Sequence, residues 1–157
     1  MRISGGQVFD PERGFVSRDV CFDGGLISEG CDGGEVYDAS GCYVIPGLTD
    51  LHFHGCMGAD FSDADAEGLE AMAKYELSRG VTQICPAGMT LLEEQLIKVC
   101  TVAADHRDAN RPGAELVGIN LEGPFLSMAK KGAQNGDWLH RPDVAMFRRL
   151  ADAGRGL

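Results

Sequence analysis

The sequence predicts an α/β fold in which helices cover a parallel sheet, preceded by a small antiparallel β module. Two observations predict it. Residues 1–45 are rich in glycine and in short runs where apolar and polar residues alternate, as in half-buried strands. From residue 46 onward, short apolar runs alternate with longer stretches of helical periodicity, the pattern of successive βα units. We therefore expect two domains, residues 1–45 and residues 46–157.

The composition fits a globular domain and argues against several functions. The 157 residues are 44% hydrophobic and 24% charged, enough to bury one core. The net charge is −10 and basic residues never run beyond a pair, so we expect no nucleic-acid partner. We find neither the apolar core of a signal peptide nor a membrane-spanning run, so we expect a cytoplasmic protein without a membrane partner.

The six cysteines form no recognisable metal-binding or redox motif. They lie at least ten positions apart and include no C-x-x-C pair. We expect all six to be free thiols, which behave as small hydrophobic side chains where they fall in apolar runs. They are Cys21, Cys31, Cys42, Cys56, Cys85 and Cys100.

Each expected element has a local signal. The first domain holds the runs QVFD, FVSRDVCF and EVYDASGCYVI, with a hairpin turn at Asp23-Gly24. GLTDLHFHG then reads as a strand. A helix is expected to open at Ser62-Asp63 and to end at Gly80. Its expected inward residues are Leu69, Met72, Ala73 and Leu77.

Two further βα units follow. VTQICP is the second strand, and Thr90 with Glu93 predicts a capping box that opens the second helix. ELVGINLEG is the third strand, and Pro142-Asp143 opens a last helix that ends at Gly154. The expected inward residues are Leu92, Leu96, Val99, Cys100 and Ala103 in the second helix, and Val144, Phe147, Leu150 and Ala151 in the last.

Three consecutive βα units predict a parallel sheet with functional residues at the carboxyl ends of its strands. A sheet of only three strands would leave edges unpaired, and no fourth strand follows in AGRGL. We therefore expect this chain to be the N-terminal part of a larger fold. Its expected partners are a second copy of the chain, in a homo-oligomer, or the polypeptide that carries the missing strands.

Polar side chains at two strand ends predict a metal site. Asp50, His52 and His54 alternate with apolar residues, so we expect the three to share one face of the first strand. Imidazoles at positions i and i+2 can converge on one ion, and we expect Asp50 to orient one of them. Glu122 ends the third strand, where a carboxylate needs a partner, and is the expected third ligand. The simpler alternative is a pair of hydrogen-bonded histidines that cap a strand.

These residues also resemble a known family. VYDASGCYVIPGLTDLHFHGCMGADF resembles the start of the amidohydrolase superfamily, and GADFSD with GINLEGPFLSMAKKGAQN narrows the resemblance to the N-acetylglucosamine-6-phosphate deacetylase family. The resemblance runs from about residue 5 to residue 153. It implies the N-terminal part of a (β/α)₈ TIM barrel, about three βα units, with a small β-sandwich side domain.

The resemblance also implies an activity and roles for particular residues. It implies metal-dependent hydrolysis of a small amino-sugar phosphate, N-acetylglucosamine 6-phosphate, to glucosamine 6-phosphate and acetate. The divalent metal is expected to be zinc, with iron, manganese and cobalt as alternatives. Glu122 matches a metal ligand, and His52 and His54 match a pair that holds a second metal in some members. Ala133 and Gln134 match a dipeptide that contacts the substrate near its acetamide.

The sequence departs from the family pattern in two respects. The position of Gln134 is often a histidine; glutamine can donate a hydrogen bond but cannot carry a proton. The family's two other metal-binding histidines and its catalytic aspartate match no position here, and His106 and His140 do not replace them. We thus expect no catalytic residue in this chain and no activity from it alone. Lys130 and Lys131 are expected in a solvated loop.

Two alternative functions remain open at this point. One is a non-enzymatic metal-binding or regulatory module derived from half of an amidohydrolase fold. The other is an amidohydrolase that acts on a different amide.

Overall fold

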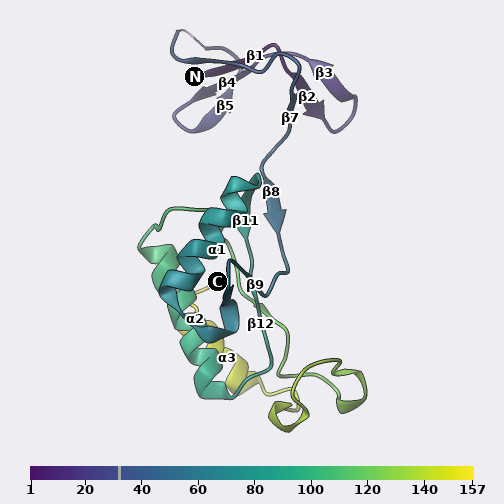
Figure 1. The fold of residues 1–157 in the computed structure, drawn as a ribbon, viewed down its shortest axis with the longest axis vertical. Coiled ribbons are helices and arrows are strands. Elements are labelled where there is room, and N and C mark those ends of the chain that lie inside the picture. The colour runs from purple at the N-terminus through teal and green to yellow at the C-terminus, as the bar shows by residue number, and fades with distance from the viewer. Residues whose placement is uncertain (32) are drawn as a thin grey trace. The chain divides into compact units, whose positions relative to one another are not determined.

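The computed structural model describes residues 1–31 and 33–157, which form two units, Met1–Pro46 and Gly47–Leu157 (Figure 1). Each unit has its own sheets. In the described residues, no helix combines the length and the apolar character that crossing a membrane requires.

The first unit contains two small sheets. The four-stranded sheet has the order β5-β4-β1-β6 and the three-stranded sheet the order β3-β2-β7. Their strands are β1 (Arg2–Ser4), β2 (Gln7–Asp10), β3 (Gly14–Ser17), β4 (Val20–Asp23), β5 (Leu26–Ser28), β6 (Val36–Asp38) and β7 (Tyr43–Val44). β6 pairs with β1, and β7 with β2, in parallel. The expectation of a purely antiparallel module is therefore wrong, because these two strands return to the sheets by longer connections than a hairpin turn.

A disulfide bond links Cys21 of β4 to Cys31, with Cα atoms 5.5 Å apart. The expectation of six free thiols is thus wrong for this pair. The chain after β5 turns back beside β4, a contact that a spacing of ten residues does not reveal. Burial raises the pKa of the Cys100 thiol to about 11, so this free cysteine stays protonated and unreactive.

The second unit is of the α/β class, as predicted. β8 (Leu48–Asp50), β11 (Val81–Ile84) and β13 (Glu115–Leu116) form a parallel sheet in the order β13-β11-β8. Further along the same chain segments, β12 (Ala87–Gly88) pairs in parallel with β14 (Asn120–Leu121). A short hairpin joins β9 (Gly55–Cys56) and β10 (Ala59–Asp60). The single expected third strand is therefore two short strands, β13 and β14.

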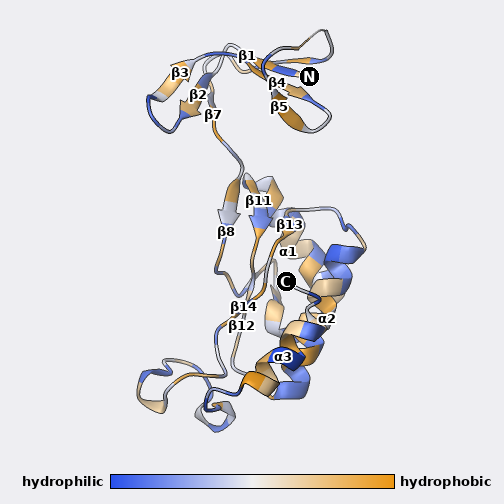
Figure 2. Cartoon of the chain, turned by 180° about the vertical axis from the view of Figure 1, so that it is seen from behind, coloured by the Kyte–Doolittle hydropathy of each residue, from blue (hydrophilic) through white to orange (hydrophobic). Residues whose placement is uncertain are grey.

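Helices α1, α2 and α3 lie along one side of these strands (Figures 1 and 2). Their bounds are Ala66–Ser78, Glu93–Asp108 and Val144–Ala153, and three short 3₁₀ turns occupy Phe61–Asp63, Met128–Lys130 and Gly136–Trp138. Hydrophobic and hydrophilic residues alternate around the helices (Figure 2), as expected for helices with one buried face. The main core lies between helices and strands and contains Phe61, Leu69, Met72, Ala73, Ile84, Val99, Ala103, Ala114 and Leu116.

Two helices begin later than the sequence predicted. α1 begins at Ala66, and the Asp65 side chain accepts hydrogen bonds from the first turn, whereas Ser62-Asp63 lies in a separate 3₁₀ turn. α2 begins at Glu93, and the predicted capping box is wrong, because the Thr90 hydroxyl donates to the carbonyl of Glu122 instead. Ser62, Asp63 and Thr90 are all of residue types that commonly cap helices. Contacts with distant parts of the chain decided where each helix begins.

The inward face of α3 also differs from the prediction. Val144 and Phe147 are 66% and 53% exposed, whereas Met146 and Leu150 are each 1% exposed and pack against α2. The prediction is thus confirmed for Leu150 and wrong for Val144 and Phe147, because the contact with α2 buries the face that carries Met146 and Leu150. The ends of α3 are as expected, with Asp143 as N-cap and Gly154 as C-cap.

His106 of α2 is 6% exposed, and burial is the main cause that lowers its pKa below the ordinary value of 6.5. Glu70 opposes this shift and Arg111 adds to it. On acidification the unfolded chain binds this proton first, so stability is lost as the pH falls below about 6.5. We expect the urea midpoint to fall less between pH 7 and pH 5 in His106→Gln than in the unmodified chain. Urea midpoints that fall equally in the two proteins would show that His106 does not cause the loss of stability at low pH.

Candidate metal centre

The two candidate histidines follow directly after β8, where the chain leaves the sheet. β8 ends at Asp50, and residues 51–54 run beside the segment that joins β11 to β12. Two backbone hydrogen bonds hold them there, from Cys85 N to Asp50 O (2.8 Å) and from Ala87 N to Phe53 O (2.8 Å). His52 and His54 are therefore placed at the carboxyl end of the first strand of the sheet, although neither belongs to it.

Asp50 does not share a face with the histidines, contrary to the prediction. It pairs with Ile84, which is buried in the core under α1, while Thr49 hydrogen-bonds Gln83 on the opposite face. Asp50 thus faces the helices, and its negative charge, after burial, helps to raise the pKa of Glu76 on α1. Its carboxylate accepts a hydrogen bond from the backbone N–H of His52 (2.9 Å), not from a ring.

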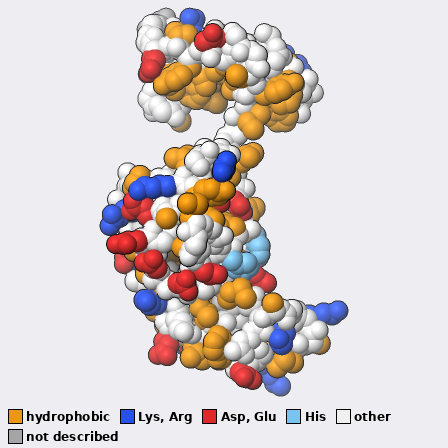
Figure 3. Space-filling view, viewed as in Figure 1, with side chains coloured by type: hydrophobic (Ala, Val, Ile, Leu, Met, Phe, Trp, Pro, Cys, Tyr) orange, Lys and Arg blue, Asp and Glu red, His pale blue; other side chains and the backbone are white. Residues whose placement is uncertain are grey.

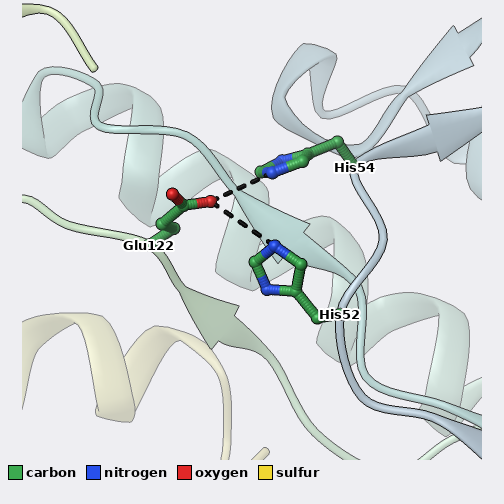
Figure 4. Close-up of side chains that lie close together, drawn as sticks. All are labelled: His52, His54 and Glu122. Carbon is green, nitrogen blue, oxygen red and sulfur yellow. Dashed lines mark ion pairs between the residues drawn. The ribbon is translucent and has the colours of Figure 1, made fainter. Parts of the chain in front are cut away.

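Glu122 completes a group of three potential ligands (Figure 4). Its Oε2 lies 3.0 Å from His54 Nε2 and 3.6 Å from His52 Nε2, and the three ligand atoms all lie within 4.8 Å of one another. Glu122 follows β14, and its backbone N–H donates to Gly88 O of the paired strand β12 (3.1 Å). Parallel pairing thus brings together residues about 70 positions apart in the sequence.

The orientation of His54 suits a metal ligand. Its Nδ1 lies 3.0 Å from the carbonyl oxygen of Ala87, an acceptor, so Nδ1 carries a proton and, in the neutral ring, Nε2 presents a lone pair. That lone pair faces a Glu122 carboxylate oxygen only 3.0 Å away. Two acceptors at this distance repel each other unless a proton or a cation lies between them. His54 and Glu122 therefore fit a divalent cation, in the arrangement by which a carbonyl commonly fixes a metal-binding histidine.

His52 is oriented differently. Asn120 Nδ2 donates to the carbonyl of Leu51 (3.1 Å) and lies 3.2 Å from His52 Nδ1. In the neutral ring, Nδ1 therefore accepts and the proton sits on Nε2, which faces Glu122. This tautomer turns its N–H toward the carboxylate, but at 3.6 Å the two are too far apart for a hydrogen bond, and the ring would bind an ion only after the proton moved. The donor set thus fits a cation on His54 and Glu122 more directly than on His52.

Solvent reaches all three side chains. They are 52% (His52), 34% (His54) and 37% (Glu122) exposed. Figure 3 shows histidine side chains gathered in one patch at the surface of the second unit. An ion held here by two or three protein atoms would keep positions open for water or substrate, as catalytic metal sites do.

Two groups that orient the rings were not predicted, Asn120 and the carbonyl of Ala87. Asn120 did carry a signal, since it lies two positions before Glu122 and so projects toward the same site. The carbonyl of Ala87 carried none, because any residue type supplies one.

The loop between β14 and α3 carries the other predicted site residues. It projects from the rest of the second unit (Figure 1). Gln134 is 2% exposed; its Oε1 accepts from Thr90 N (2.7 Å) and its Nε2 lies 3.6 Å from Met89 Sδ. Ala133 is exposed. Gln134 is therefore occupied within the protein, and contact with an acetamide would require it to exchange these partners.

The remaining predicted loop and histidine positions lie outside the ligand group. Lys130 is exposed, whereas Lys131 Nζ donates to Gln134 O (2.7 Å). His106 is buried on α2, and His140 is exposed in the loop, so neither joins the three ligands.

Comparisons with known proteins show consistent similarity. No family model matches the chain. It is 32% identical over 126 residues to an N-acetylglucosamine-6-phosphate deacetylase of Bacillus subtilis, covering 78% of this chain and 32% of the relative. To the enzyme of the same name from Homo sapiens it is 33% identical over 151 residues, covering 94% of this chain and 34% of the relative. The chain thus spans about a third of the length of the curated relatives it matches.

Solved structures give the same result. The crystal structure of N-acetylglucosamine-6-phosphate deacetylase from Thermotoga maritima superposes with a TM-score of 0.79 at 26% identity, over 95% of this chain and 39% of that one. The enzyme of that name from Pasteurella multocida gives a TM-score of 0.84 at 22% identity, over 99% of this chain and 42% of that one, and so supports the fold alone. A mutant Mycobacterium smegmatis deacetylase in complex with N-acetyl-D-glucosamine-6-phosphate gives 0.71 at 25% identity, over 99% and 41%.

Proposed function

The chain is a homologue of the N-acetylglucosamine-6-phosphate deacetylases, matching an N-terminal portion of them, and we propose that it supplies part of the catalytic site of such an enzyme. The reaction proposed for the complete enzyme is hydrolysis of the acetamide of N-acetylglucosamine 6-phosphate, which yields glucosamine 6-phosphate and acetate. The similarity over most of this chain supports the proposal.

The proposal assigns a place in the fold to each unit. The three parallel strands and their helices in Gly47–Leu157 are proposed to be the first βα units of a (β/α)₈ barrel, and Met1–Pro46 part of a β-sandwich side domain. Two features support this assignment. The strands β8, β11 and β13 lie in the sheet in their sequence order, and the helices lie along one side of the strands. In a barrel, the ends of these strands would face the open mouth, where the candidate ligands lie.

One observation carries the functional proposal: His54 Nε2 and a carboxylate oxygen of Glu122 face each other at 3.0 Å, while His54 Nδ1 is taken up by the carbonyl of Ala87. We propose that both hold a divalent cation, zinc being the expected one. When bound, such a cation lowers the pKa of a water molecule and polarises an amide carbonyl. His52, whose Nε2 lies 3.6 Å from the Glu122 carboxylate, is proposed as the third ligand once its ring proton has moved. Ala133 and Gln134 are proposed to lie near the substrate.

The remaining parts of the proposal come from composition and family resemblance. They are a cytoplasmic location, a small amino-sugar phosphate as ligand, and assembly as a homo-oligomer or with a companion polypeptide. The resemblance implies a ligand set larger than the three residues gathered here. We therefore expect the chain by itself to bind metal reversibly.

Metal analysis tests the proposed site. After chelator treatment and dialysis, the 157-residue chain is titrated with Zn²⁺ by calorimetry, and its metal content is measured again after a second dialysis. We expect one binding event that the second dialysis reverses, because few protein ligands hold the ion. Stoichiometric zinc that resists a chelator would show that these residues complete a site. Failure to bind Zn²⁺ at any concentration would reject the metal centre.

A further inference from the structure

Thr90 lies between the candidate metal ligand and the loop that follows it. It comes just after β12 and is 2% exposed, which makes it one of the few buried polar residues in the described part of the chain. Its hydroxyl donates to the backbone carbonyl of Glu122 (3.1 Å), and its backbone N–H donates to Gln134 Oε1 (2.7 Å). One residue therefore joins two segments that are 32 and 44 positions away in the sequence.

The contact with Glu122 fixes the backbone at the ligand. The N–H of Glu122 donates to Gly88 O and its carbonyl accepts from Thr90, so both polar backbone groups are satisfied by the segment that enters α2. Gly123, the next residue, has φ +106°, and a Cβ atom there would collide with the Thr90 hydroxyl. The hydroxyl is thus packed tightly against the peptide that follows the ligand, where only glycine fits.

The contact with Gln134 fastens the loop. Residues 123–142 contain only short 3₁₀ turns and project from the second unit (Figure 1). Gln134 is 2% exposed, and losing its partner would leave a buried polar group unsatisfied. Lys131 Nζ, which donates to the carbonyl of Gln134, ties the preceding turn to the same point.

We propose that Thr90 is a positioning residue that couples the candidate ligand Glu122 to the loop of residues 123–142. A divalent cation on Glu122 and His54 then favours the loop conformation in which Gln134 is bonded to Thr90. In turn, that loop conformation favours cation binding, because it holds the Glu122 backbone in place. The two effects are equal in free energy, because coupling between two sites is reciprocal. This inference rests on the proposed metal centre and assigns Thr90 no contact with ion or substrate.

Three variants of the 157-residue chain test the coupling with Zn²⁺ as the only ligand. Thr90→Val removes the hydroxyl at similar volume, and Thr90→Ser keeps it. Thr101→Val is the matched control, because the Thr101 hydroxyl also donates to a backbone carbonyl, that of Ile97, but within α2. Zn²⁺ affinity is measured by calorimetry. The loop is followed by trypsin cleavage after the exposed Lys130 and by the emission of the single tryptophan, Trp138, which lies in the loop.

In the unmodified chain, Zn²⁺ is expected to slow the cleavage and to shift the Trp138 emission. Thr90→Val should bind Zn²⁺ about tenfold more weakly, which is the lower end of the range for losing a group that supports a metal ligand. Zn²⁺ should also no longer slow trypsin cleavage of the loop in this variant. Thr90→Ser and Thr101→Val should both behave like the unmodified chain. If Thr90→Ser binds Zn²⁺ normally, the loss in Thr90→Val is due to the missing hydrogen bond and not to a general packing defect.

Gln134→Ala examines the same coupling from the loop side and should also weaken Zn²⁺ binding, even if Thr90→Val fails to fold. Unchanged Zn²⁺ affinity and loop protection in a folded Thr90→Val, or unchanged affinity in Gln134→Ala, would overturn the coupling and leave the metal centre standing. An unmodified chain that binds no Zn²⁺ would reject the metal centre itself, and the coupling with it.

Discussion

Replacing Glu122 by glutamine is expected to weaken Zn²⁺ binding by more than about 100-fold, since losing a group that merely supports a ligand already costs about 10- to 100-fold. Glutamine has nearly the same shape but no negative charge, so the lone pair of His54 Nε2 would be the main attraction left for a cation. His52 cannot compensate, because its Nε2 carries the proton while Asn120 donates to Nδ1. Calorimetric titration of the 157-residue variant measures the loss.

Glu115→Gln is the matched control for this measurement. Glu115 is exposed on β13, upstream of Glu122 in the same βα unit, and its replacement changes the net charge equally. Its Zn²⁺ affinity should equal that of the unmodified chain, because a solvent-exposed charge outside the site is screened by salt. Binding by Glu122→Gln that matches binding by Glu115→Gln would remove Glu122 from the site.

The 157-residue chain is expected to release no acetate from N-acetylglucosamine 6-phosphate, with or without added Zn²⁺. Hydrolysis requires the ion to be held firmly with an open position and a base that accepts and returns a proton. The described residues gather three candidate ligands, and the family resemblance implies the role of base for none of this chain's residues. Acetate release is measured enzymatically, and the Bacillus subtilis deacetylase in the same buffer serves as the positive control.

The opposite result would be specific and informative. Zn²⁺-dependent acetate release that disappears in Glu122→Gln would show that this chain holds a complete catalytic set. The base would then have to be sought among Asp50, His106 and His140. Asp50 faces α1 and His106 is buried on α2, so the exposed His140 would be the first to substitute.

Much of the second unit could be predicted because its signals are local. Asp143 and Gly154 bound α3 as expected, since a cap depends on residues within one helical turn. VTQICP contains β11, because a short apolar run before a helix has few alternatives. The same locality made His52, His54 and Glu122 visible as one candidate group: parallel βα units carry the ends of successive strands to one edge of the sheet.

By itself, then, the sequence determined the α/β class, the order of the elements and which side chains could meet at the strand ends. Only the tertiary structure decided which side of β8 Asp50 faces, that α3 buries Met146 beside Leu150, and that Cys21 pairs with Cys31. It also decided that Thr90 bonds Glu122 instead of capping α2. The physical reason is the same in each case: several partners satisfy the local preference equally well, and the path of the distant backbone selects one of them.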